Sequence, residues 1–202
     1  MFTFASYSLI KKHMKKLLFI LLISLSYNSY SQIMPIDSST KQITYQGVDT
    51  INGKTKLEIY SAIRGWVATA FINSKTVIQM DDKEAGKIIC TANIPVSFLN
   101  RKSEPYQDAG YVKFVLTLLI KDGKYKFIFN DFIHIWENRT TGNLKYDSSG
   151  GKLENEKPDC GTMSLGKSNW DSIKNQTHNT IQIIIKDIHT SSLSISVSND
   201  NF

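Results

Sequence analysis

Cysteine is scarce in this sequence, with only Cys90 and Cys160 among 202 residues. The chain is therefore not one of the small secreted scaffolds that depend on a dense set of disulfides. Cys90 falls in an apolar run and Cys160 in a loop flanked by proline and glycine. One disulfide is compatible with the even count, but a domain of this length needs no covalent staple. The interpretation we favour is one buried thiol and one exposed thiol.

Groups that hold metals or perform catalysis are also sparse. The few histidines show no spacing with each other or with cysteine that is typical of a metal site; they are His13, His134, His178 and His189. The acidic cluster around Asp81 does not match a calcium loop. Because no nucleophile motif or phosphate-binding loop is present either, we expect no metal and no cofactor, and a protein that is more readily explained without catalysis.

Long hydrophobic runs are missing as well. The run LLFILLISLSY is shorter than the roughly 20 residues of a membrane span. Lysines precede it and the polar stretch NSYS follows, which is the pattern of a cleaved secretory signal peptide. We expect residues 1–31 to be that signal, with cleavage between Ser31 and Gln32, and the protein to be periplasmic or secreted. Met14 could itself begin a complete leader.

The basic charge lies largely in this leader. Residues 1–31 contain four of the 24 basic residues and none of the 18 acidic ones, so their removal lowers the formal net charge from +6 to +2. A charge this small does not favour a nucleic acid as partner. We therefore expect no nucleic-acid binding.

The clearest structural signal is a β-hairpin between Ala109 and Trp136. Two runs of β-branched and aromatic residues flank Asp122-Gly123, the pair that most favours a type I′ turn. Lys121 opposite Lys124 sets a register in which Leu118 faces Phe127, Leu116 faces Phe129 and Val112 faces Ile133. One face of this hairpin is then apolar except for Asp131, and it should be the core.

Weaker patterns complete the fold. We expect a strand at 42–48, a helix capped by Thr55 and Glu58, and a hairpin around residues 81–85. A polar loop at 137–161 and a second helix capped by Ser168 and Asp171 follow. Two amphipathic helices should cover one face of a single antiparallel sheet, giving an α+β fold. The predicted boundaries are a flexible segment at 32–41, one domain at 42–190 and a disordered tail at 191–202.

Several stretches together resemble a known family. They are KTKLEIYSAIRGWV, DDKEAGKI, KDGKYKF and the later WDSIK helix. They are similar to an uncharacterised family of exported bacterial proteins with a TBP-like fold, over about residues 42–190. The resemblance implies the order strand, helix, four antiparallel strands, helix, and it brings no catalytic residues because the family's role is unassigned.

The sheet face away from both helices is the candidate binding surface. In the regular register it carries Tyr111, Lys113, Lys126, Asn130, Phe132, His134 and Trp136. This mixture of aromatic and polar groups suits a ligand or protein partner. The alternatives are a homodimer through the same face, a hydrolase-like enzyme with His134 in its site, and nucleic-acid binding on the face.

Overall fold

The computed structural model describes residues 34–71, 74–98, 107–136, 139–141, 144–146, 149–160 and 165–194. All of them belong to one compact unit that begins at Met34. The predicted signal peptide, with its cleavage site at Ser31 and Gln32, lies outside the described residues.

A six-stranded antiparallel sheet forms the centre of this unit. Its main strands, in spatial order, are β1 (Tyr45–Thr50), β5 (Lys124–Ile135), β4 (Gln107–Lys121), β3 (Lys87–Phe98) and β2 (Ile78–Asp82). A short strand, β8 (Gly151–Lys152), pairs with β5. Both hairpins expected from the sequence are present, because β2 pairs with β3 and β4 pairs with β5.

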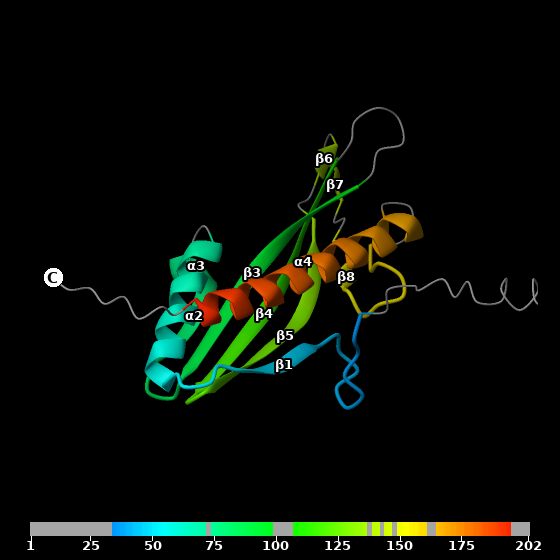
Figure 1. Cartoon of the computed structure of the whole chain (residues 1–202). Helices are drawn as coiled ribbons and strands as arrows, with labels where there is room; N and C mark the ends of the chain where they lie inside the picture. The colour runs from blue at the N-terminus through cyan, green and yellow to red at the C-terminus, as the bar shows by residue number, and fades with distance from the viewer. Residues whose placement is uncertain are drawn as a thin grey trace, which may run out of the picture. The chain divides into compact units, whose positions relative to one another are not determined.

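Two long helices lie on one face of the sheet, as Figure 1 shows. Helix α4 (Lys167–Leu193) runs across the strands in front of the sheet. Helix α2 (Lys56–Ala70) lies beside the C-terminal end of α4. The short helix α3 (Ser74–Val77) leads from α2 into β2. The predicted α+β class is confirmed. No helix in the part of the chain described here is long and apolar enough to cross a membrane.

The core lies between the helices and the sheet. Helix α2 buries one stripe, which includes Ile63 and Trp66, and α4 buries another, which includes Trp170 and Ile173. Cys90 is buried on the same face of β3, while Cys160 is partly buried, and no disulfide joins them. In β3, and in β4 and β5 away from their irregularities, residues on this face are buried and their neighbours along the strand are not. This is the alternation expected of a sheet covered on one side.

The start of α2 is held by the capping box that its sequence predicts. The Thr55 hydroxyl accepts a hydrogen bond from the Glu58 N–H at 3.3 Å. The Glu58 carboxylate in turn accepts the Thr55 N–H at 2.8 Å. The hydrogen bonds that the Glu58 carboxylate accepts lower its pKa to about 2, and the bond from the Thr55 N–H is the largest cause. Two N–H groups that the first turn leaves without helical partners are thereby satisfied.

Replacing Thr55 with alanine should therefore lower the free energy of unfolding by about 1 kcal/mol, as for other N-cap threonines. Chemical denaturation of the variant measures this loss. The matched control is Ser168→Ala, for which we expect no change, because α4 begins at Lys167 with Gly166 as its N-cap and no side-chain capping bond. The cap predicted at Ser168 is thus wrong. An equal loss in both variants would contradict this assignment of the caps.

Three other boundaries differ from those predicted. The described part of the segment at 32–41 forms a hydrogen-bonded turn, in which the Thr44 N–H donates to the Pro35 carbonyl at 2.9 Å and Met34 is buried. The loop at 137–161 contains β8 and two further strands, β6 (Arg139–Thr141) and β7 (Leu144–Tyr146). Helix α4 continues to Leu193, beyond the predicted start of the tail, and residues 195–202 lie outside the described part.

Candidate binding face

The β4–β5 turn sets the register of the sheet as its sequence predicts. Lys121 pairs with Lys124, Leu118 with Phe127 and Leu116 with Phe129. Gly123 has a φ of 71°, in the left-handed region that glycine adopts without strain. From the turn to Val115, every residue of the hairpin lies on the face expected for it.

A β-bulge in β5 then changes the register. The pairing shifts between Lys113 and Val115, so that Val112 lies opposite His134 instead of Ile133. Asp131 has a φ of 57°, a conformation that aspartate visits more readily than most residues. The bulge turns the Asp131 carboxylate to solvent and inserts one extra residue into β5. All side chains after Asp131 consequently change face.

The predicted positions of Phe132, His134 and Trp136 on the open face are therefore wrong. Phe132 and His134 are fully buried on the helix side. The Phe132 ring lies 5.8 Å from that of Tyr45 and 6.1 Å from that of Phe114, measured between centroids. Trp136 packs edge-on against Phe98, with 5.0 Å between ring centroids. Phe132 and His134 thus lie in the core, and Trp136 is partly buried against it.

His134 is held as a neutral ring by two buried hydrogen bonds. Its Nδ1 accepts the Gly150 N–H at 2.8 Å, so Nε2 carries the hydrogen and donates to the Ala109 carbonyl at 2.7 Å. Burial lowers the pKa of His134, and the bond to Ala109 opposes that shift. Gly150 has no room for a side chain, because a Cβ there would overlap the Trp170 ring. The ring joins β4, β5 and the segment before β8, and it has no opening to a substrate.

The bulge also moves Ile133 and Ile135 onto the other face, where they join the predicted residues Tyr111, Lys113, Lys126 and Asn130. We call this surface the open face. Its residues on strands β1, β3, β4 and β5 include Gln46, Val48, Thr50, Ile89, Thr91, Asn93, Tyr111, Lys113, Val115, Thr117, Leu119, Lys126, Ile128, Asn130, Ile133 and Ile135. No helix of the described chain covers it. Val48 is 59% exposed.

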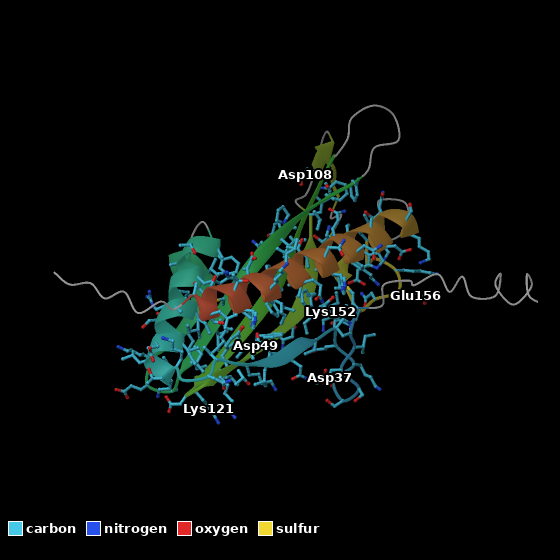
Figure 2. All side chains as sticks on the ribbon, viewed as in Figure 1. Asp37, Asp49, Asp108, Lys121, Lys152 and Glu156 are labelled. Carbon is cyan, nitrogen blue, oxygen red and sulfur yellow. The ribbon has the colours of Figure 1, made fainter. Side chains whose placement is uncertain are left out.

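Lysines gather at the turn end of the open face. Lys87 lies opposite Leu119, which lies opposite Lys126, and Lys121 lies opposite Lys124. Figure 2 marks Lys121 at this end of the sheet. Among the described residues none of these lysines forms an ion pair. Asp82 in β2 pairs with Lys87 in β3, and it is the one described carboxylate directly opposite any of these lysines in the sheet. An apolar surface with a cationic border results.

A second polar cluster lies between β1 and α4, on the helix side. The Tyr125 hydroxyl donates to the Asp49 carboxylate at 2.6 Å, and His189 lies 3.3 Å from the same oxygen. Burial and the bond to Asp49 raise the pKa of Tyr125. The Tyr45 hydroxyl meets His178 at 2.8 Å, so both contacts attach β1 to α4.

Across the described ranges no group of three or more His, Cys, Asp or Glu residues is arranged to hold a metal.

Solved structures share this architecture. A TBP-like protein from Parabacteroides distasonis matches with a TM-score of 0.58 at 18% identity, over 80% of this chain and 97% of that one. A DUF4468 family protein from Bacteroides ovatus matches with a TM-score of 0.56 at 15% identity, over 78% of this chain and 90% of that one. Identities this low support the fold alone. No curated protein matches the chain.

The sequence itself carries the family signal over the part that forms the sheet and the first helix. Residues 45–134 match the model described as a domain of unknown function (DUF4468) with TBP-like fold. The match begins at β1 and ends at His134, and it includes α2, both hairpins and the bulge. Residues 45–134 of this chain thus match the DUF4468 domain with TBP-like fold, as the motifs of the sequence indicated.

Proposed function

We propose that this protein is an exported, non-catalytic binding module whose open face docks on a protein partner. The observation that carries the proposal is an apolar sheet face that no helix of the described chain covers. The lysines at its border form no ion pair among the described residues, and only Lys87 has a carboxylate opposite it in the sheet. Apolar patches of this kind on soluble proteins usually mark an interaction surface. The basic and apolar pattern of residues 1–31 supports export. His134, which is buried and holds two backbone groups, does not supply an accessible acid or base.

The charge of the border indicates the chemistry of the partner. In a homodimer formed through the open face, the border lysines of the two copies would lie close together and repel each other. These lysines are Lys121, Lys124 and Lys126. An apolar patch flanked by carboxylates complements both parts of the face. We therefore assign the face to an acidic-rimmed protein partner, with Ile128 and Ile133 near the centre of the contact.

The proposal predicts a crosslink at one isoleucine and none at another. A p-benzoylphenylalanine placed at Ile128 should form a discrete adduct in the natural host cell. The matched control is Ile183 on α4, which is 60% exposed on the helix side and should form none. Gel mobility and mass spectrometry identify the adduct.

Charge reversal separates a specific contact from random capture. Lys124→Glu with Lys126→Glu should abolish the adduct, whereas Lys186→Glu on the exposed side of α4 should leave it unchanged. Raising the salt concentration should weaken it, because screening shortens the reach of exposed charges. An adduct of two copies of this chain, or equal adducts at Ile128 and Ile183, would refute the assignment.

A further inference from the structure

A hollow of about 500 Å³ lies at the corner where the open face meets the end of α2. Strand β2 pairs with β3 only as far as Cys90, yet β3 continues to Phe98. The edge of β3 beyond Cys90 therefore has no neighbouring strand in the described chain, and the end of α2 and helix α3 form the opposite wall. A volume of this size is typical of small-molecule sites.

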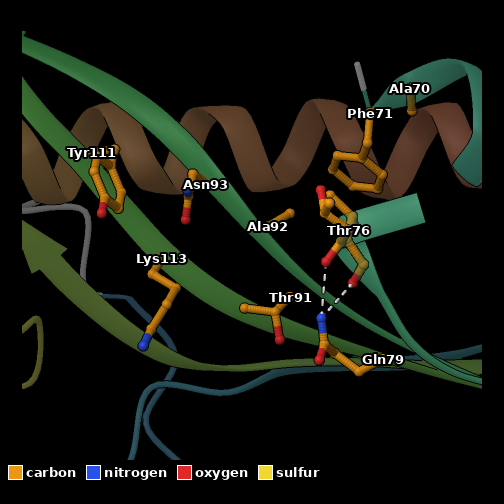
Figure 3. Close-up of a pocket in the computed structure, with 10 residues that line it drawn as sticks. Ala70, Phe71, Thr76, Gln79, Thr91, Ala92, Asn93, Tyr111 and Lys113 are labelled. Carbon is orange, nitrogen blue, oxygen red and sulfur yellow. Dashed lines mark hydrogen bonds between the residues drawn. The ribbon is translucent and has the colours of Figure 1, made fainter. Parts of the chain in front are cut away.

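The two ends of the hollow differ in chemistry. The α2 end is apolar, with Ala70, Phe71 and Val77 in its lining. Figure 3 shows Lys113 at the end away from Phe71, on β4. Among the described residues that line the hollow none is Asp or Glu, and Lys113 is the one that carries a charge. An occupant that placed an anion at Lys113 and an apolar body against Phe71 would match both ends.

Polar side chains near Lys113 are available for a ligand. Asn93 lies directly opposite Lys113 in the β3–β4 register, and Tyr111 lies two pairs further along, opposite Pro95. Neither residue makes a side-chain hydrogen bond within the described ranges, and Lys113 forms no ion pair there. Gln79 differs, because its Nε2 donates to the Thr76 carbonyl at 3.0 Å. The amide and hydroxyl are thus free to bond a second polar group.

The backbone at this edge adds further groups. The Gln176 side chain accepts the Ser97 N–H at 3.1 Å and donates to the Ser97 carbonyl at 2.8 Å, so the backbone of Ser97 points to the edge. Alternate residues of a strand point their N–H and C=O groups the same way. Asn93 therefore directs its N–H and C=O to the same edge, beside the hollow, where neither β2 nor Gln176 reaches.

From these observations we infer that the hollow binds a small amphipathic organic anion, a carboxylate joined to a planar apolar body. The carboxylate lies at Lys113, with donors from Asn93 and Tyr111, and the apolar body lies against Phe71. This inference goes beyond the docking of a protein on the open face, and it does not depend on that proposal.

Three indole compounds with the same ring and different charges test it. Indole-3-acetate is an anion, indole-3-acetamide is neutral and tryptamine is a cation. Titrated into the 15N-labelled protein at millimolar concentration, indole-3-acetate should bind most tightly and shift the amide signals of Thr91, Asn93 and Lys113. Equal affinities for the three compounds, shifts elsewhere, or no binding would overturn the inference.

A pair of lysine variants locates the charge. Lys113→Gln should weaken binding of indole-3-acetate about two- to fivefold, the effect of one partly exposed ion pair, and should leave binding of the amide unchanged. Lys126→Gln removes a lysine from the same face outside the hollow and should have no effect. Equal weakening by both variants would mean that the anion responds to the general charge of the face, which would refute a site at Lys113. The Ile128 crosslink reports separately on the protein partner.

Discussion

Replacing Phe132 with alanine is expected to lower the free energy of unfolding by about 3–5 kcal/mol, the range for a buried phenylalanine. The same change at the next residue, Ile133, should cost about 1 kcal/mol, a typical value for a single substitution. The contrast arises because Phe132 is fully buried between the sheet and the helices, while Ile133 lies on the open face and is partly exposed. Urea denaturation of both variants measures the difference.

This pair of variants tests the β-bulge directly. Without the bulge, Phe132 would lie on the open face and Ile133 in the core, and the two losses would be exchanged. Asp131→Gly should be well tolerated, because glycine adopts the φ of 57° at this position more readily than aspartate. Greater destabilisation by Ile133→Ala than by Phe132→Ala would contradict the register of β5.

The pattern of the sequence predicted most of the fold because the relevant forces are local. A period-two alternation with a strong turn at Asp122-Gly123 sets the strand pairing, and a period near 3.6 sets the buried stripes of α2 and α4. The capping box of α2 is local as well. Elements that depend on distant partners were not predicted, including β8, whose pairing with β5 joins residues that a long segment separates.

The candidate site was predicted only as far as the bulge. Tyr111, Lys113, Lys126 and Asn130 lie on the open face as expected, because they precede the shift in β5 or lie on β4. One signal for the bulge was present in the sequence. A regular register places Asp131 on the apolar face, where an unpaired carboxylate is costly, and a single inserted residue removes that conflict. Reading Asp131 as a bulge would have placed Phe132 and His134 correctly.

The hollow at the β3 edge had no sequence signal. It arises because β2 pairs with β3 only as far as Cys90, while β3 continues to Phe98. The end of α2 lies beside this unpaired edge of β3. Both facts depend on tertiary packing between segments that the sequence pattern treats separately. Its lining residues Phe71 and Gln79 belong to regions that were expected to be only a helix end and a strand.

Replacing His134 with alanine should be as damaging as the loss of Phe132. The change leaves the Gly150 N–H and the Ala109 carbonyl buried without their partner. Each such group costs about 1–3 kcal/mol, so the expected loss is about 2–6 kcal/mol. His134→Gln is the matched variant, because an amide can accept from Gly150 and donate to Ala109 without titrating. It should retain much of the stability that alanine loses.

The same ring makes the stability of the fold depend on pH. Burial lowers the pKa of His134 below its usual value of 6.5, so at acidic pH the unfolded chain binds a proton that the native ring does not. The free energy of unfolding should therefore fall as pH decreases below about 6.5 and level off below the native pKa, with no contribution from His134 at higher pH.

Urea denaturation of the wild type and of His134→Gln between pH 7.5 and pH 5 separates this effect from that of other titrating groups, which both proteins share. The wild type should lose more stability over that range than the variant. Parallel pH profiles, or a wild type that becomes relatively more stable in acid, would mean that the protonated ring is accommodated in the native core. In that case Nδ1 could not be the acceptor of the Gly150 N–H, because a protonated imidazole carries hydrogen on both nitrogens.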